Sequence, residues 1–336
     1  MKEAIVAPDQ TVEIVDSPIP IPQPGQVLIK VIFSGSHDIA GIVHALGAGV
    51  YQFKVGDRVA AFHEMFTPGA SFAEYALAWQ CTTFHLPDHV SFAEAATLPL
   101  AGMTAAVGLY RYLGLPEPWS SATPKDSEKR PILVYGAASA VGAFAVQLAR
   151  LSGLHPIMGV AGRGVAFAEG LIDKSKGDAI IDYRGGEKAV IAGIKDALQA
   201  AGCDHVPLQY CFDAIAEAGT HEIIAAVLDT KLGSSKATHV MPIERFATKG
   251  FKYPKGIEAS LMMVGDVHGP AKDFGYIWLQ YFSRLLEDGR LKPHPFEEKP
   301  GGLGGIAAAL RDLKEGKASA VKYVFDIGRT EGVERA

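Results

Sequence analysis

The sequence predicts an α/β protein in which a doubly wound parallel sheet is inserted into a β-rich domain. Short β-rich runs bounded by turn signals fill the first hundred residues, and strands alternate with helices between residues 131 and 242. A last strand pattern follows at 320–325. With 336 residues, the chain is long enough for two domains that each bury a core.

The β-rich pattern begins at the N-terminus. We expect strands at 26–33, at 39–46, from 56–59 onward and at 71–77, where the residues alternate with period two. Ser91 and Glu94 stand at capping-box spacing, which predicts a helix over 93–97.

The alternating pattern occupies the middle of the chain. A helix is expected at 103–112, and a polar, proline-rich stretch at 117–130 leads into a strand that begins at Pro131. Further strands are expected at 156–161, 179–183, 208–213 and 238–242, with helices at 187–201 and 219–228 among them. After residue 266 we expect helices at 274–286 and 304–315 before the last strand. Such alternation predicts a parallel sheet with helices on both faces.

The most informative stretch runs from Pro131 to Ala149: an aliphatic strand, a turn of small residues and a helix. This order is typical of a dinucleotide site, because a pyrophosphate needs a tight turn and the free N–H groups of a helix N-terminus. Gly136 and Gly142 occupy the first and third glycine positions of the fingerprint, and Ser139 replaces the second. The expected cofactor-binding residues of the turn are Gly136, Ala138, Ser139, Ala140, Val141 and Gly142. A membrane span over these 19 uncharged residues is disfavoured, because the small-residue turn interrupts it.

Composition excludes several classes of partner. A formal net charge of −5 gives no electrostatic case for binding nucleic acid or an anionic membrane. Three cysteines without metal-ligand spacing, Cys81, Cys203 and Cys211, favour a reducing compartment, and no apolar signal region opens the chain. We therefore expect a cytoplasmic protein.

Several motifs follow one another in a recognisable order. They are Gly56-Asp-Arg-Val59, Phe72-Ala-Glu-Tyr75, Ala95 to Ala101 with Thr104, Gly136 to Gly142, Phe212-Asp213 and Gly316 to Val324. In this order the chain resembles the zinc-free medium-chain dehydrogenase/reductase superfamily, in particular the quinone oxidoreductases and the fungal trans-acting enoyl reductases. The resemblance implies a GroES-like catalytic domain, 1–105 plus 266–336, with a Rossmann NADPH-binding domain inserted at 106–265. It also implies an active-site cleft between the two domains, where ligands commonly bind.

Catalytic zinc is not expected. Such a site needs three converging N, S or O ligands. His37-Asp38 is faintly similar to the His-Glu pair of the zinc-containing branch, but Ser34, Gly35 and Ser36 precede it without a cysteine, and the downstream ligand position is Leu100. Without a Lewis acid, reduction of an activated C=C bond or a quinone is the better prediction than alcohol oxidation.

The residues after the second strand of the inserted domain favour NADPH. The strand ends in Val160-Ala-Gly-Arg163, without the carboxylate that NAD enzymes offer to the ribose, whereas Arg163 suits a 2′-phosphate. The alternative is that Arg163 is a solvated loop residue. The resemblance implies that Lys174 or Lys176, together with Tyr183, completes this pocket. It also implies that backbone groups near Met241 and Val264 contact the nicotinamide carboxamide.

Candidate catalytic residues rest on the same resemblance. Thr104 is implied to orient the nicotinamide ring; the alternative is a helix threonine that bonds to its own turn. Tyr75, His63 and Tyr51 are the first-domain residues expected to reach the cleft, with a core or rim position as the alternative. His85 and Cys211 are expected to be structural.

One departure from the relatives concerns the substrate wall. Ser36-His37 joins two strands almost directly, where the relatives carry an excursion of roughly two dozen residues, and such loops usually carry substrate contacts. Either part of the wall is lost, or the sequence omits residues, and in both cases the general acid stays unassigned.

The sequence thus predicts an NADPH-dependent reductase of a small hydrophobic enone, enoyl thioester or quinone. The alternatives are a carbonyl or alcohol dehydrogenase and a non-catalytic NADPH-binding protein. The oligomeric state stays open, and a homodimer is one assembly that the prediction allows.

Overall fold

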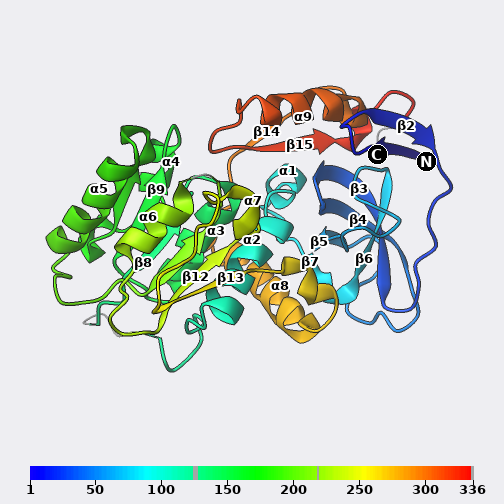
Figure 1. The fold of residues 1–336 in the computed structure, drawn as a ribbon. Helices are drawn as coiled ribbons and strands as arrows, with labels where there is room; N and C mark the ends of the chain where they lie inside the picture. Colours follow the sequence, from blue (N-terminus) through cyan, green and yellow to red (C-terminus); the bar gives the residue numbers. More distant parts are fainter. Residues whose placement is uncertain (124–127, 218, 334–336) are drawn as a thin grey trace. The chain divides into compact units, whose positions relative to one another are not determined.

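A computed structural model describes residues 1–123, 128–217 and 219–333, and the chain divides into two compact units (Figure 1). We call Met1–Met103 with Val264–Ala336 the terminal unit and Thr104–Met263 the central unit. The sequence-based boundaries, 1–105 plus 266–336 and 106–265, lie two residues from these at each junction.

The terminal unit is built on a sheet whose strands come from both ends of the chain. Its order is β14-β15-β3-β4-β5-β7, and β6 pairs with β3. The strands are β3 (Gln26–Gly35), β4 (Asp38–Leu46), β5 (Arg58–Phe62), β6 (Tyr75–Trp79), β7 (Thr83–His85), β14 (Phe296–Glu298) and β15 (Lys322–Asp326). Because β15 pairs with β3, the central unit is an insertion into this fold. A separate hairpin joins β1 (Lys2–Val6) to β2 (Val12–Asp16).

Strand β3 shows why this sheet forms. Val27, Ile29 and Val31 alternate along it and lie in one buried cluster with side chains of β4, β5, β15 and α9 (Ile306–Lys314). The strand expected at 71–77 begins only at Tyr75. Residues 72–74 instead exchange backbone hydrogen bonds with β1.

Helices complete the terminal unit. The capping box of Ser91 and Glu94 is formed and starts α1 (Phe92–Ala95). The long amphipathic α8 (Lys272–Glu287) buries Trp278 and Phe282 and packs along β7. Helix α2 (Pro99–Ala106) begins in the terminal unit and continues into the central unit as the π-helical stretch Val107–Tyr112. By length and composition Phe92–Tyr112 could cross a membrane, but 83% of its apolar window is buried inside the protein.

The central unit is a six-stranded parallel sheet in the order β10-β9-β8-β11-β12-β13. Its strands are β8 (Ile132–Tyr135), β9 (Ile157–Ala161), β10 (Ala179–Asp182), β11 (Tyr210–Asp213), β12 (Ser235–His239) and β13 (Ile257–Leu261). Its helices are α3 (Ala140–Leu151), α4 (Val165–Glu169), α5 (Glu187–Ala200), α6 (Thr220–Val227) and α7 (Ile243–Phe246). The order reverses between β10 and β11, so right-handed crossovers place the earlier and later helices on opposite faces. The predicted doubly wound sheet is confirmed.

Two strands of the central unit differ from expectation. β12 begins three residues before the predicted 238–242, because its polar residues Ser235 and Lys236 pair with β13 and β11 and hide the apolar pattern. Pro242 then lies beyond the strand, where the backbone has already left the ladder. β13 has the half-exposed sequence Ile-Glu-Ala-Ser-Leu and gave no strand signal.

Candidate functional site

The carboxyl ends of the central strands line up at one edge of the sheet. Tyr135 is in register with Val160 on one side and with Asp213 on the other, and Asp213 is in register with His239. The strand order reverses at this edge beside β8, which is where open α/β sheets bind their ligands.

The turn after β8 requires glycine at both ends. Gly136 has a φ of +83°, and a Cβ atom there would overlap the side chain of Ile215. A Cβ atom on Gly142 would overlap the carbonyl oxygen of Gly136. The two glycines therefore let the first turn of α3 pack directly on the end of β8, as a dinucleotide fingerprint does.

Ser139 fills the second glycine position and begins α3. Its hydroxyl accepts a hydrogen bond from the backbone N–H of Gly142 at 3.1 Å. The side chains of Ser139, Ala140 and Val141 are only half-buried, and all are small. Backbone N–H groups of a helix start beneath such small side chains fit a pyrophosphate, so this turn suits a nicotinamide dinucleotide.

Arg163 and Tyr183 follow neighbouring strand ends. The ring of Tyr183 lies against Gly162, where an added Cβ atom would be 2.6 Å from Cζ and 2.8 Å from the hydroxyl oxygen. Arg163 is exposed next to Gly162. The nearby Asp182 is bound by the Arg184 guanidinium, whose hydrogen bonds lower the pKa of Asp182 to about 2. Arg163 and Tyr183 thus follow the ends of two adjacent strands, and their contact with a ribose phosphate stays a prediction.

Lys174 does not lie with them, which corrects the expectation from the sequence. It precedes β10 and lines a polar pocket of about 360 Å³ with His155 and Gly177, at the amino ends of the strands. Its ammonium group pairs with Glu169 at 3.1 Å. β9 separates this edge from Arg163 by about 13 Å. Lys176 belongs to the same short helix at the amino ends of the strands, so it too lies away from Arg163.

The two expected carboxamide positions fall in different units. Met241 is half-buried just after β12, where the N–H of Val240 donates to the Asp213 carbonyl at 3.2 Å. Val264 opens a short 3₁₀ helix, Val264–His268, of the terminal unit. Their contacts with a cofactor remain predictions.

Thr104 lies within α2 and is 7% exposed. In the terminal unit, the Tyr75 ring packs edge-on against His44, with 4.8 Å between ring centroids. Tyr51 is 92% exposed. The roles of Thr104 and Tyr75 stay predictions.

His63 is held by the backbone. Its Nδ1 lies 2.8 Å from the carbonyl oxygen of Leu77 and its Nε2 lies 3.2 Å from that of Thr67. The side chain is buried, and both ring nitrogens face carbonyl oxygens, so His63 is a structural residue. Its buried position agrees with the alternative of a core residue that the sequence left open. His85 hydrogen-bonds Asp57 at 3.1 Å, and Cys211 is fully buried, in keeping with the structural roles expected for both.

The short junction forms a closed hairpin. β3 and β4 pair up to Gly35 and Asp38, and Ser36 takes a φ of +70° in the two-residue turn. Asp38 is buried, forms an ion pair with Lys322 of β15 and accepts the backbone N–H of Leu100. Burial raises the pKa of Asp38, and the Lys322 ammonium opposes that rise. Asp38 therefore fixes the hairpin to the C-terminal strand.

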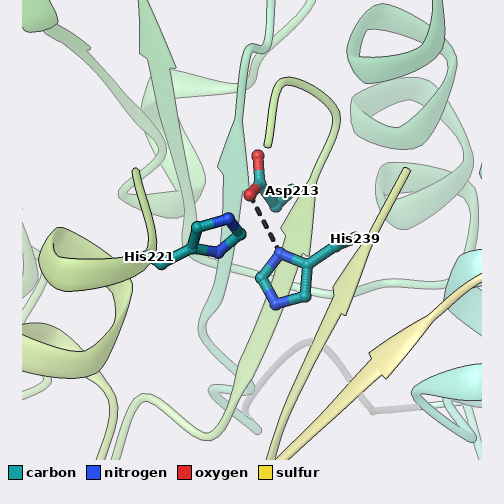
Figure 2. Close-up of side chains that lie close together, drawn as sticks. All are labelled: Asp213, His221 and His239. Carbon is teal, nitrogen blue, oxygen red and sulfur yellow. Dashed lines mark hydrogen bonds and ion pairs between the residues drawn. The ribbon is translucent and has the colours of Figure 1, made fainter. Parts of the chain in front are cut away.

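The structure adds a cluster that the sequence had not indicated. Within the described residues, one group of metal-ligating side chains has its ligand atoms within 4.8 Å of one another: Asp213, His221 and His239 (Figure 2). All three are buried. Burial lowers the pKa of His221. The only signals in the sequence were Asp213 at the end of the strand predicted at 208–213 and His239 within the strand predicted at 238–242.

Comparison with known proteins agrees with both units. The alcohol dehydrogenase GroES-like domain family matches residues 23–88. Trans-enoyl reductase fsr4 of Gibberella fujikuroi is 42% identical over 325 aligned positions, which cover 91% of this chain and 92% of that protein. Trans-enoyl reductase resD of Aspergillus sclerotiorum is 30% identical, with 96% and 98% covered. The quinone oxidoreductase of Pseudomonas syringae pv. Tomato has the same fold, with a TM-score of 0.72 at 20% identity and coverage of 96% and 98%.

The alignment with fsr4 is longer than the part of this chain that it covers, so that relative carries residues which this chain lacks. The nucleotide turn, the inserted parallel sheet and the identity over nine-tenths of the chain lead to one assignment. The chain belongs to the trans-enoyl reductase family of the medium-chain dehydrogenase/reductase superfamily, and is a nicotinamide-dependent oxidoreductase of the enoyl and quinone reductase type.

Proposed function

We propose that the protein is an NADPH-dependent reductase that acts on an activated C=C bond, in an enone or an enoyl thioester, without a catalytic metal. A quinone is the second acceptor class, because a quinone oxidoreductase shares the fold. The observation that carries the cofactor part is the placement of Arg163 and of the Tyr183 ring beside Gly162 at adjacent strand ends.

NADPH is favoured over NADH by charge. Beside the ribose position, Arg163 offers the planar donors that bind phosphate in pairs. The end of β9 presents no carboxylate that would repel a 2′-phosphate. An enzyme selective for NADH would place an acidic side chain there to bind the ribose hydroxyls.

The chain's own groups would bind and orient the reactants. The N–H groups at the start of α3 hold the pyrophosphate, and Thr104 orients the nicotinamide through its hydroxyl. When bound, the dinucleotide supplies a hydride. Hydrogen-bond donors then polarise the acceptor oxygen, a task that needs no metal. The ion pair between Asp38 and Lys322 supports a reaction without catalytic zinc at the Asp38 position.

The test is cofactor oxidation with a panel of enones, enoyl thioesters, quinones and aldehydes, with NADPH and NADH compared for each. We expect turnover with enones or enoyl thioesters and a preference for NADPH. Turnover with aldehydes alone would instead indicate a carbonyl reductase. Tight NADPH binding without turnover on any acceptor would indicate a binding protein.

A further inference from the structure

We propose that Asp213, His221 and His239 form a binding site for a transition-metal dication, best suited to zinc, at the carboxyl ends of β11 and β12. The site lies wholly within the central unit, at the same edge of the sheet as the nucleotide turn, and the reduction proposed above does not depend on it. It is also distinct from the Asp38 position, where zinc-containing relatives of the superfamily would hold their metal.

The three side chains come from three elements that the fold brings together. Asp213 ends β11, and His239 ends β12 in register with it. His221 is the second residue of α6, which follows β11 after a short loop. Figure 2 shows the His221 ring beside the hydrogen-bonded Asp213 and His239, and the possible ligand atoms of the three lie within 4.8 Å of one another. Because two of the ligands are fixed by strand pairing, the site is largely formed by the backbone.

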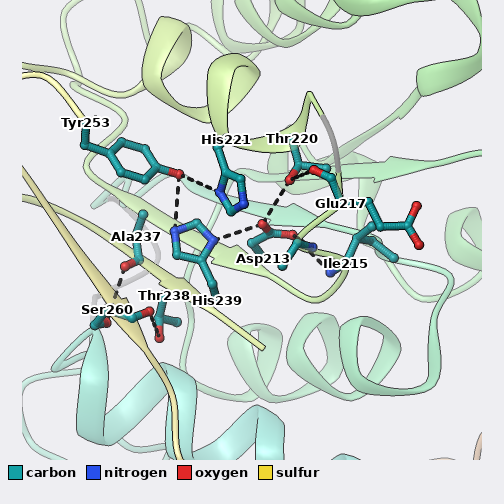
Figure 3. Close-up of polar contacts among 11 residues, drawn as sticks. Asp213, Ile215, Glu217, Thr220, His221, Ala237, Thr238, His239, Tyr253 and Ser260 are labelled. Atoms are coloured by element: carbon teal, nitrogen blue, oxygen red, sulfur yellow. Dashed lines mark hydrogen bonds and ion pairs between the residues drawn. The ribbon is translucent and has the colours of Figure 1, made fainter. Parts of the chain in front are cut away.

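The Asp213 carboxylate is anchored in an orientation that leaves one oxygen for the site. Its Oδ1 accepts the backbone N–H groups of Ile215 and Ala216, at 3.0 and 2.9 Å. Its Oδ2 faces His239 Nδ1 at 2.9 Å and also accepts the Thr220 hydroxyl at 3.3 Å. Figure 3 shows the contacts of Asp213 with Thr220 and His239 together.

Without a metal, the hydrogen bonds of this network leave one ring nitrogen, Nε2 of His221, without a partner among the described residues. His239 Nδ1 donates to Asp213, so its Nε2 must accept from the Tyr253 hydroxyl, 3.2 Å away. The Tyr253 oxygen in turn accepts from His221 Nδ1 at 3.4 Å. His221 Nε2 is then a buried lone pair, and among the described residues it has no hydrogen-bond partner. Leaving such a group unmet costs stability.

A metal ion resolves that deficit. If the His239 proton moves from Nδ1 to Nε2, then Nδ1 of His239, Nε2 of His221 and Oδ2 of Asp213 all present lone pairs to a cation. Both remaining ring N–H groups then point at the Tyr253 oxygen, which has two lone pairs to accept them, and the hydroxyl proton that His239 no longer accepts turns away from the two rings of this half-buried tyrosine contact. Metal-bound histidines characteristically donate their other N–H to such a fixed partner.

The donor set selects the ion. Two imidazoles and one carboxylate suit zinc, whereas calcium and magnesium prefer oxygen ligands alone. Zinc bonds of about 2.0–2.1 Å in a tetrahedron place ligand atoms about 3.3 Å apart. Asp213 and His239 already stand at 2.9 Å, so His221 must close the remaining gap by at most about 1.5 Å. A water molecule or the Thr220 hydroxyl would take the fourth position.

The test uses the full-length protein, prepared without a histidine tag and stripped with a chelator. Zinc content is measured by mass spectrometry after reloading and desalting, and cobalt(II) is titrated to record its visible absorption. We expect about one ion per chain and the intense cobalt bands of a tetrahedral site. His221→Gln should abolish both signals, and Tyr253→Phe should weaken metal affinity about 10- to 100-fold.

The matched control is His155→Gln. His155 pairs with the buried Asp178 at 2.8 Å in the same unit, so the variant loses a comparable buried His–Asp contact, and it should keep one ion per chain. A wild-type protein that retains less than about a tenth of an ion and gives no tetrahedral cobalt bands would show that the cluster is only a hydrogen-bonded network. That wild-type result decides the proposal even if a variant fails to fold. Equal binding by wild type and His221→Gln would also overturn it.

Discussion

Tyr183 lies against Gly162 so closely that only a glycine fits beneath its ring: an added Cβ atom would stand 2.6 Å from the ring carbon Cζ. The two residues belong to neighbouring strand ends, and Arg163 follows directly. Tyr183 and Arg163 therefore both follow strand ends at the carboxyl edge of the sheet, where the proposed reductase would bind the 2′-phosphate.

Gly162→Ala should displace the Tyr183 ring and weaken the binding of NADPH more than the binding of NADH. A forced shift of the ring costs a fraction of a kcal/mol to about 1.5 kcal/mol, so the KM for NADPH should rise about threefold to tenfold. The KM for NADH should change little. Gly304→Ala is the control for the added methyl group, since a Cβ atom there meets nothing within 4 Å. An equal effect on both cofactors would argue against a phosphate-specific role.

Arg163→Ala tests the cation itself. Loss of a hydrogen bond to a charged group is worth about 1.5–3 kcal/mol, which predicts a rise of about 10- to 100-fold in the KM for NADPH. Lys174→Ala serves as the matched control, because the structure pairs Lys174 with Glu169 at the other edge of the sheet. Should Lys174→Ala raise the KM for NADPH as strongly, the placement of the phosphate pocket is wrong.

Ser139→Ala removes the hydroxyl that caps α3 at the nucleotide turn. Urea unfolding should show a loss of about 1 kcal/mol of stability, and titration should show weaker NADPH binding. Ser91→Ala removes the equivalent cap of α1 and should cost a similar free energy without changing NADPH affinity. Unchanged NADPH binding in Ser139→Ala would place the cofactor elsewhere.

Lys322→Met leaves the buried Asp38 carboxylate without its counter-ion. The free energy of unfolding at pH 7 should fall by about 3–5 kcal/mol. Because burial raises the pKa of Asp38 in the folded state, the folded variant takes up a proton more readily, and part of the loss should be regained as the pH falls. Urea unfolding at pH 7 and pH 5 measures this. Lys317→Met, which removes the two surface ion pairs with Asp312 and Glu315, should have little effect at either pH.

His294 should contribute to loss of stability in mild acid. Burial lowers the pKa of His294 to about 4, below the ordinary value of 6.5. Between these two pH values the imidazole is protonated in the unfolded chain and neutral in the folded chain. This contribution to stability is complete above pH 6.5 and is lost as the pH falls from 6.5 to 4. In a His294→Gln variant, unfolding free energies measured over this range should fall less steeply than in the wild type. Parallel curves would assign the acid sensitivity to other groups.

Local sequence determined the nucleotide turn. Gly136 supplies the positive φ, Gly142 allows the close approach to the Gly136 carbonyl, and Ser139 caps the helix that follows, so all three requirements are met within seven consecutive residues. The alternation of strands and helices could likewise be predicted, since the spacing of apolar residues differs between a strand and a helix. β12 and β13 were misplaced or missed because pairing with neighbours, rather than an apolar pattern, holds them in the sheet.

Only the tertiary structure decided which distant residues meet. Lys174 is close to Arg163 in the chain, yet α4 and the residues after it return the chain from the carboxyl end of β9 to the amino end of β10, so the two lie at opposite edges of the sheet. Asp38 and Lys322, from the two ends of the chain, meet as a buried pair. Asp213, His221 and His239 converge because strand register and a helix start place them there. Sequence periodicity specifies which face of an element is buried, whereas register and crossover direction specify which side chains share a site.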